Sequence, residues 1–316
     1  TPDIFQAIKA LEGGKPVAIP TETVYGMAAL VTDEAAIRAV FTLKNRPLNH
    51  PLIVHVADNC DLTTLVKHIP DYAQQLIQHF WPGPLTLVFP CKDTVNPLIT
   101  GGQSTVAIRS PAHPLTQKLL RHLKAPLVAP SANPFGRISP TTALHVYQAF
   151  SQEDLTILDG GRCQVGIEST ILDVTQPDSY TILRHGVIDA LAIGKVISTP
   201  CVHRESDLRV PGKLESHYQP QKPLYYFASF SDLTSFCQKH PDEVYVLANQ
   251  LPTKVAPELF HPLEACPQKM AYDLFFQLRQ ADDSKAKYIA IELPPETQQW
   301  LGLRERILKA GSVWKG

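Results

Sequence analysis

The sequence lacks the features that mark several large classes of protein. No apolar run approaches the roughly 18 residues needed to cross a bilayer, and no charged-then-apolar leader opens the chain. The six cysteines are scattered without a CxxC pair, and the twelve histidines contain no HExxH. These absences argue against a membrane protein, an exported protein and a zinc framework. We therefore expect a cytoplasmic protein.

The sequence also carries little net charge. Its 29 basic and 30 acidic residues give a formal net charge of −1 over 316 residues. Domains whose main task is to coat nucleic acid are usually clearly basic. A net charge near zero argues against that class, although it is compatible with a local basic pocket.

Common nucleotide and hydrolase motifs are missing as well. No GxxxxGK[ST] is present, because the LEGGKP stretch ends in Lys15 followed by Pro16. No GxGxxG follows a strand-like run, and no GxSxG nucleophile elbow occurs. A P-loop enzyme, a plain dinucleotide dehydrogenase and an α/β-hydrolase therefore all lose support.

Strand-like and helix-like runs alternate over residues 1–193, which predicts an α/β domain. Helices are expected at 3–14, 33–45, 113–123 and 139–150, the last with Ser139 as N-cap and Pro140 in its first turn. Strands are expected at 16–20, 51–56, 85–89, 105–110, 126–130, 155–161, 169–174 and 180–184.

The composition changes after residue 193. Residues 194–223 lack clear periodicity and contain four prolines, so we interpret them as a long linker. The linker includes VPGKLESHYQP, whose polar side chains are unusual in a spacer, although a plain tether remains an open alternative. Residues 224–316 then alternate three strand-like runs with three helix-like runs, which predicts a small unit resembling half of a doubly wound sheet.

Polar clusters of the first 193 residues fall at strand ends or in the loops beyond them. Ligands of open α/β sheets bind beyond the carboxyl ends of the strands. The clusters offer the cations Lys44, Arg46, Arg109, Arg137 and Arg184, and the hydroxyls of Thr21, Thr23, Ser131, Ser139 and Ser169. Such a set suits an anionic ligand rich in oxygen atoms.

Each cluster also has a purely structural interpretation. The KNR stretch could be a solvated helix end, and Arg109 and Arg184 could pair with structural carboxylates. The PSAN stretch could be a simple turn, and His55 could be a core histidine. The coincidence of all these clusters within one domain is what favours a binding site.

Seven blocks of the sequence, taken in order, resemble the YrdC-like domain over residues 1–193. These blocks are PTETVYG, KNRPLNHPLIVHV, FWPGPLTLVF, TVAIRSPAHP, PLVAPSANPFGRISPT, GIESTILD and LRHGVI. The PGKLESHYQP stretch and the small α/β unit after it resemble the long, two-domain L-threonylcarbamoyladenylate synthases. The resemblance implies an α/β fold with a twisted mixed sheet and flanking helices, a linker or lid at 194–223, and a small Rossmann-like three-layer domain at 224–316.

The resemblance also implies a reaction. Enzymes of this family, which are nucleotidyltransferases, condense L-threonine, bicarbonate or CO2, and ATP to threonylcarbamoyl-AMP and pyrophosphate. A separate transferase complex then passes the threonylcarbamoyl group to adenosine 37 of tRNAs that read ANN codons. Direct contact of this chain with tRNA is therefore expected to be weak or absent.

The matched blocks imply two sets of site residues. The threonine set is Thr23, His55, Arg109, Ala129 and Ser169. The ATP set is Arg46, His50, Thr105, Ser131, Ser139, Arg184 and Tyr218, with Lys44 and Arg46 expected as catalytic cations. Mg2+ is expected to be held mainly by ATP. His50 stands where the family commonly has Asn, and we expect this difference to change the affinity for ATP and not to abolish the activity.

Three points stay open. The general base is open: His55 is a candidate by residue type alone, and the substrate or bicarbonate could serve instead. Since adenylates are labile in water, we expect the linker to act as a lid that brings His217 and Tyr218 over the nucleotide. The alternatives to this enzyme are a double-stranded RNA-binding module without catalysis, and a carbamoyl transferase of the hydrogenase-maturation type. For the latter, upstream acylphosphatase-like and zinc-finger segments would be expected, and the sequence has neither.

Overall fold

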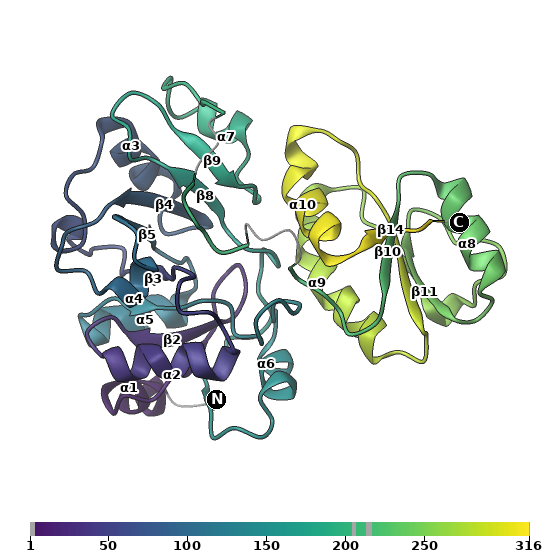
Figure 1. Ribbon diagram of the computed structural model, residues 1–316, viewed down its shortest axis with the longest axis horizontal. Coiled ribbons are helices and arrows are strands. Elements are labelled where there is room, and N and C mark those ends of the chain that lie inside the picture. Colours follow the sequence, from purple (N-terminus) through teal and green to yellow (C-terminus); the bar gives the residue numbers. More distant parts are fainter. Residues whose placement is uncertain (1–3, 204–206, 213–216, 316) are drawn as a thin grey trace. The chain divides into compact units, whose positions relative to one another are not determined.

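The computed structural model describes residues 4–203, 207–212 and 217–315. The chain folds into two compact units, Thr1–Phe135 with Ser139–Lys213, and Gly136–Ile138 with Leu214–Gly316. Each unit is built around a sheet of its own (Figure 1). None of the helices in the described ranges has the length and apolar character that crossing a membrane requires.

The first unit contains a nine-stranded sheet in the order β7-β1-β2-β6-β3-β5-β4-β8-β9. The sheet is mixed, since β3 and β5 are parallel whereas β4 and β5 are antiparallel. Its strands are β1 (Val17–Ile19), β2 (Gly26–Leu30), β3 (Ile53–His55), β4 (Leu85–Pro90), β5 (Thr105–Arg109), β6 (Leu127–Val128), β7 (Thr156–Ile157), β8 (Thr170–Asp173) and β9 (Thr181–Arg184).

The helices of the first unit agree in part with the sequence prediction. They are α1 (Ile4–Glu12), α2 (Glu34–Lys44), α3 (Asp71–Phe80), α4 (Pro97–Thr100), α5 (Pro114–Leu123), α6 (Ala143–Ala149) and α7 (Ala190–Gly194), with a 3-10 turn at Leu62–Thr64. The predicted cap of α6 was wrong. Thr142 caps this helix by accepting from the backbone N–H of His145, whereas the Ser139 hydroxyl donates to Glu168.

The central strands separate the core from a second face of the sheet. Successive side chains of a strand point to opposite faces. Val106 and Ile108 of β5 belong to the main core, together with Val54, Leu87 and Leu172. Ala107 belongs to a smaller cluster with Ile53, Val88, Ile171 and Val210. Thr105 and Arg109 therefore lie on the same face as this smaller cluster.

The second unit is a five-stranded parallel sheet in the order β12-β11-β13-β10-β14. Its strands are β10 (Leu224–Phe227), β11 (Val244–Ala248), β12 (Phe260–Pro262), β13 (Tyr288–Glu292) and β14 (Ser312–Val313). Its helices are α8 (Phe230–Lys239), α9 (Pro267–Asp283) and α10 (Leu301–Ala310), with 3-10 turns at Pro257–Leu259 and Gln298–Trp300.

Helices cover both faces of this parallel sheet. Figure 1 shows α8 on one side of the strands and α9 and α10 on the other. This arrangement confirms the predicted three-layer α/β class. The expected number of three strands was wrong, because β12 and β14 are edge strands of only three and two residues. Neither contains an apolar run long enough to be recognised in the sequence.

Much of the stretch interpreted as a linker is packed against ordered structure. The N–H of Val202 donates to the carbonyl of Tyr180, and Thr181 Oγ1 donates to the carbonyl of Val202. Val210 is 5% exposed and packs on the second face of the large sheet. Residues 204–206 and 213–216 of the stretch lie outside the described residues.

Candidate active site

Arg109, at the end of β5, is the centre of a buried polar group. One terminal nitrogen of its guanidinium donates to Thr23 Oγ1 at 2.9 Å, and the other donates to Glu22 Oε2 at 3.2 Å. The side chains of Arg109 and Glu22 are only 4% and 6% exposed. Within the described structure, Arg109 Nε and Glu22 Oε1 have no hydrogen-bond partner. Arg109 therefore pairs with a carboxylate and at the same time contacts Thr23, which was predicted to bind the substrate threonine.

His55 lies beside Arg109 on the neighbouring strand. The two residues are paired in the register of β3 and β5, and the Nδ1 of His55 is 3.2 Å from the carbonyl oxygen of Ile53. Burial, together with the positive charge of Arg109, lowers the pKa of His55 to about 3. The imidazole is therefore neutral near pH 7. A general base works best with a pKa near the operating pH, so this geometry favours His55 as a hydrogen-bonding group.

Ser169 is held close to the same strands. Its hydroxyl lies 2.7 Å from Thr86 Oγ1, and its carbonyl accepts from two nitrogens of Arg184 at 3.1 and 2.9 Å. Leu87 pairs with Ile108, so the antiparallel register places Thr86 next to Arg109. Sequence reasoning missed Thr86, although its alternation with Leu85 and Leu87 in an otherwise apolar strand is a usable signal.

Two close backbone approaches fix the walls around these residues. Ala129 N donates to the carbonyl of Ile53 at 3.1 Å, which places Ala129 two residue pairs away from His55, whose partner is Leu127. A side chain at Gly186 would bring a Cβ within 2.5 Å of the Thr170 nitrogen. The glycine of LRHG therefore lets the chain after β9 lie against the residues around Ser169. The structure thus brings four of the five predicted threonine-binding residues together around the ends of β3, β4 and β5, namely Thr23, His55, Arg109 and Ser169. Ala129 lies opposite the first residue of β3.

The KNR stretch turns inward at the end of α2. Asn45 adopts a left-handed conformation with φ of 51°, and its N–H bonds the last carbonyls of the helix. Lys44 and Arg46 on either side are 1% and 8% exposed. The alternative of a solvated helix end is therefore wrong. Among the residues that the structure describes, no carboxylate lies within ion-pair distance of Lys44 or Arg46.

Lys44 binds the backbone of the PSAN loop. Its Nζ donates to the carbonyls of Ser131, at 2.6 Å, and Asn133. Burial, reinforced by the charge of Arg46, lowers the pKa of Lys44 well below its ordinary value. In this geometry Lys44 shapes the loop that carries Ser131, which also forms a bridge with Gly26 of β2.

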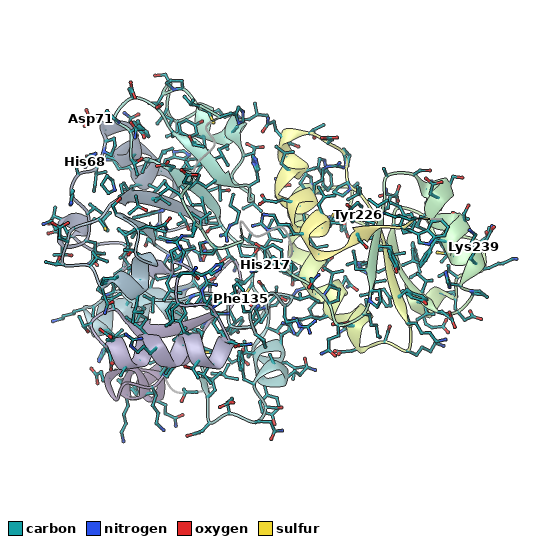
Figure 2. The ribbon with its side chains drawn as sticks, viewed as in Figure 1. His68, Asp71, Phe135, His217, Tyr226 and Lys239 are labelled. Atoms are coloured by element: carbon teal, nitrogen blue, oxygen red, sulfur yellow. The ribbon has the colours of Figure 1, made fainter. Side chains whose placement is uncertain are left out.

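Arg46 and His50 meet at the ring of Phe135, which is labelled in Figure 2. The guanidinium carbon of Arg46 is 5.5 Å from the centre of the ring, and the His50 ring packs edge-on at 5.1 Å. Arg46 also donates to the carbonyl of Pro51 at 2.8 Å, and burial lowers its pKa to about 10. Sequence reasoning missed Phe135, which lies two residues after Asn133 within the same block.

The remaining predicted ATP residues lie further along the chain. Thr105 starts the strand that Arg109 ends, so the two are separated by roughly 13 Å at about 3.3 Å per residue. The Ser139 hydroxyl donates to Glu168. Tyr218 belongs to the second unit, where it has a φ of 62° and stacks on Phe275 with ring centres 5.5 Å apart.

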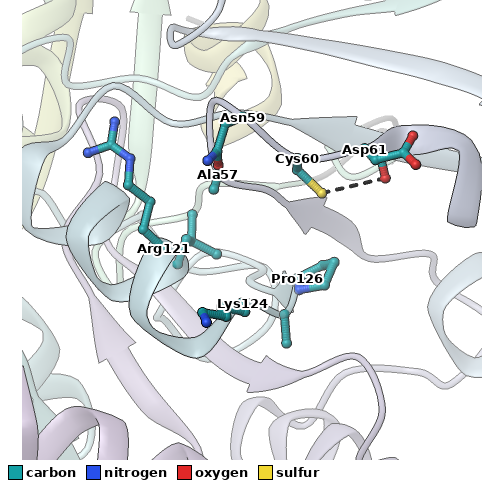
Figure 3. A pocket seen from close by; sticks show the side chains of 9 residues that line it. Ala57, Asn59, Cys60, Asp61, Arg121, Lys124 and Pro126 are labelled. Atoms are coloured by element: carbon teal, nitrogen blue, oxygen red, sulfur yellow. Dashed lines mark hydrogen bonds between the residues drawn. The ribbon is translucent and has the colours of Figure 1, made fainter.

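A hollow of about 360 Å³ lies elsewhere in the first unit, between the loop after β3 and the end of α5 (Figure 3). Its lining includes Asn59, Cys60, Arg121 and Lys124, and none of the predicted site residues. Over the described ranges, no group of three or more His, Cys, Asp or Glu side chains could hold a metal ion.

Comparison with known proteins decides the family. A family model described as "Telomere recombination" matches residues 9–186, and one described as "Threonylcarbamoyl-AMP synthase, C-terminal domain" matches residues 186–312. The chain belongs to the threonylcarbamoyl-AMP synthase family. The resemblance seen in the sequence blocks is thereby confirmed.

Family relatives extend over nearly the whole chain. A threonylcarbamoyl-AMP synthase of Pyrococcus abyssi is 37% identical, covering 94% of this chain and 90% of the relative. A threonylcarbamoyl-AMP synthase of Bacillus subtilis is 34% identical, covering 98% and 93%. The structure of P. abyssi Sua5 complexed with L-threonine has a TM-score of 0.88 at 34% identity, covering 98% of this chain and 96% of that one. This likeness places both units within the family fold.

Proposed function

We propose that this family member is an L-threonylcarbamoyladenylate synthase, a nucleotidyltransferase that uses ATP, L-threonine and bicarbonate or CO2. The observation that carries the proposal is the Arg109 group. Its guanidinium joins Thr23 to a buried carboxylate beside a neutral His55, on the face of the sheet that also carries Thr105. Relatives named threonylcarbamoyl-AMP synthase, and a relative's structure with L-threonine, support the assignment.

The polar groups around Arg109 suit threonine, which carries a carboxylate, an ammonium group and a hydroxyl. Arg109 offers a guanidinium for the carboxylate, while Glu22 compensates most of its charge. The hydroxyls of Thr23 and Ser169 and the neutral ring of His55 supply hydrogen bonds without further charge. The subsite would therefore bind a small zwitterion.

Carbamate formation needs the threonine amine in its neutral form. The ammonium loses a proton, and the nitrogen lone pair then attacks the carbon of CO2. An N–C bond forms, one C–O π bond of CO2 opens onto oxygen, and the nitrogen loses a second proton to the base, which gives the carbamate. Because the pKa of His55 is about 3, we assign the base to bicarbonate or to the substrate itself. His55 instead orients the substrate.

Adenylation follows by displacement at phosphorus. A carbamate oxygen attacks the α-phosphorus of ATP, the bond from that phosphorus to the bridging oxygen breaks, and pyrophosphate leaves. Such a step depends on alignment and on neutralised charge. Arg46 packs against the Phe135 ring and has no carboxylate partner among the described residues, so its charge is available to the phosphates. Lys44 binds the backbone of the PSAN loop. Mg2+ would be held mainly by ATP and would neutralise part of the charge of its phosphates.

The product would serve a separate transferase complex that modifies adenosine 37 of tRNA. The near-neutral net charge of the chain fits an enzyme that hands over a small adenylate without binding tRNA tightly. The decisive experiment measures pyrophosphate release from MgATP with and without L-threonine and bicarbonate. Release that needs both supports the proposal. Salt-dependent binding of double-stranded RNA without such turnover would favour an RNA-binding module.

Thr23→Ala tests the threonine subsite. The change removes the hydroxyl that accepts from Arg109 and leaves a buried donor without its partner, so the KM for threonine should rise about tenfold. The KM for ATP should change by less than about twofold. Thr42→Ala, on the exposed side of α2, is the control. Equal increases in both KM values would contradict the assignment of Thr23.

A further inference from the structure

Two buried hydroxyls of the first unit meet where β4 and β8 begin. Thr86, the second residue of β4, and Ser169, directly before β8, have side-chain oxygens 2.7 Å apart. Thr86 is 0% exposed and Ser169 is 1% exposed. Solvent does not reach hydroxyls at such positions, so their protons need acceptors in the protein or in a ligand.

The hydrogen bonds of this pair leave one proton over. Each hydroxyl carries one proton, and only one of the two lies between the paired oxygens. The pair also accepts from Arg184, whose Nη2 donates to Ser169 Oγ at 3.2 Å, and this bond uses no hydroxyl proton. Within the described structure the second hydroxyl proton therefore has no acceptor. A buried donor left in this way is costly, which points to an acceptor that a ligand supplies.

A second donor without an acceptor lies on the neighbouring strand. The antiparallel register pairs Leu87 with Ile108, so Thr86 lies opposite Arg109 on the same face of the sheet. Arg109 Nε has no hydrogen-bond partner among the described residues. The spare hydroxyl proton and this N–H thus come from adjacent strand positions. A carboxylate has two oxygens that only accept, so it suits both donors at once.

The guanidinium beside Ser169 favours one direction for the bond within the pair. Ser169 Oγ has two lone pairs, and one of them already accepts from Arg184. When Thr86 donates into the other, Ser169 accepts two bonds and its own proton is the one left over. Hydrogen bonds in a chain polarise one another, so an oxygen that accepts twice is also a stronger donor.

We propose that Thr86 is a positioning residue for the carboxylate of the substrate amino acid. By donating to Ser169 Oγ, it fills the lone pair that Arg184 leaves and turns the Ser169 proton toward the ligand. Ser169 then donates to the carboxylate beside the guanidinium of Arg109. The inference rests on the proposed function, because threonine is the substrate there.

The test compares Thr86→Val with Thr181→Val. Valine keeps the branched shape of threonine and removes only the hydroxyl. Thr181 is a second buried threonine of the same sheet, and its hydroxyl donates to the backbone carbonyl of Val202, away from the pair. Thr181→Val should therefore leave the affinity for L-threonine unchanged.

Thr86→Val should weaken the binding of L-threonine about fivefold, measured by calorimetry without ATP, since the loss of one neutral hydrogen bond has that order of effect. The KM for ATP should stay within about twofold and kcat within about threefold, because the carboxylate is not a reacting group. A merely structural role would lower both affinities. Thr86→Ser keeps the hydroxyl and should bind L-threonine within about twofold of the wild type.

A double-mutant cycle with Ser169→Ala tests whether Thr86 acts through Ser169. Adding Thr86→Val to Ser169→Ala should weaken threonine binding by less than about a further twofold, because the two residues act as one unit. A further loss of about fivefold would mean that Thr86 contacts the ligand itself, and this result overturns the positioning role.

The proposal also fails if Thr86→Val binds L-threonine as tightly as Thr181→Val does, or if threonine and ATP affinities fall together. Should Thr86→Val not fold, Thr86→Cys replaces it, because a thiol is only a weak donor. An unchanged threonine affinity of that variant overturns the proposal.

Calorimetry with L-threonine alone separates this proposal from the proposed function. A wild-type protein that binds L-threonine but releases no threonine-dependent pyrophosphate would overturn the function. Weaker threonine binding by Thr86→Val, with the cycle result above, would still support the positioning role.

Discussion

The buried cations of the first unit differ in what balances their charge. Arg109 is paired with Glu22, and both side chains are almost completely buried. Lys44 and Arg46 are equally buried, yet within the described structure they bind backbone carbonyls and no carboxylate. The first region is close to neutral, whereas in the second region Arg46, whose pKa is about 10, keeps a positive charge that no carboxylate among the described residues balances.

This difference matches the two substrates of the proposed reaction. Threonine is a zwitterion, so a region whose own charges cancel can bind it without leaving a net buried charge. The triphosphate of ATP carries several negative charges, which makes unpaired cations useful to it. The contrast teaches that the net charge of a ligand is indicated less by the number of buried cations in its site than by the carboxylates that pair with them.

The largest expected effect comes from breaking the compensated pair. Arg109→Met leaves the Glu22 carboxylate buried without its partner, and removing one member of a buried pair costs roughly 3–5 kcal/mol. The free energy of unfolding, measured by urea denaturation, should fall by about that amount. The double variant Glu22→Gln, Arg109→Met should recover part of the loss, because no charge is then left stranded.

Arg121→Met is the matched control for this prediction. Arg121 pairs with Asp58 at an exposed position, where such pairs contribute about 1 kcal/mol or less. If Arg109→Met lowered the free energy of unfolding no more than Arg121→Met does, the Glu22–Arg109 pair would not be the compensated centre described above.

A smaller effect on folding is expected from the uncompensated region. Arg46→Met strands no carboxylate, so its loss of unfolding free energy should be clearly less than that of Arg109→Met. Its affinity for MgATP, measured by calorimetry, should nevertheless fall about tenfold or more, as expected for a lost charged donor. A stability loss as large as that of Arg109→Met, with unchanged ATP affinity, would reverse the comparison.

The smallest effect concerns pH. The pKa of His55 is lowered to about 3 in the folded protein from an ordinary 6.5, so the unfolded chain binds more protons between these values. The free energy of unfolding should therefore decrease as the pH falls below 6.5. His55→Asn should reduce this slope by up to about 1.4 kcal/mol per pH unit. Urea denaturation of both proteins between pH 4 and 7, with identical slopes, would count against a buried neutral ring.

The first unit shows what local sequence can predict. The apolar run of TVAIR predicted β5, and the blocks that resemble the family predicted Thr23, His55 and Arg109, which the structure gathers around Arg109 and its strand neighbours. The pairing of Arg109 with Glu22 escaped because nothing local shows which carboxylate an arginine pairs with. That pairing depends on strands far apart in the sequence.

Conformation and long-range packing limited the remaining predictions. The KNR stretch was open to a solvated interpretation, since only the left-handed Asn45 turns its two cations inward. The membership of Gly136–Ile138 in the second unit has no local signal, because it depends on Arg279, which donates to the carbonyl of Ile138 from more than a hundred residues away. Edge strands such as β14 are too short to produce a pattern.

The alternation of β5 has a consequence for how this enzyme tolerates change. Thr105, Ala107 and Arg109 lie on one face, and Val106 and Ile108 fill the core on the other. Deleting a single residue in the middle of this strand would turn half of its side chains over, because strand periodicity is two. The guanidinium would then be forced toward the apolar interior, and Ile108 would turn to the polar face. Insertions and deletions in this strand should thus be far rarer among functional variants than substitutions.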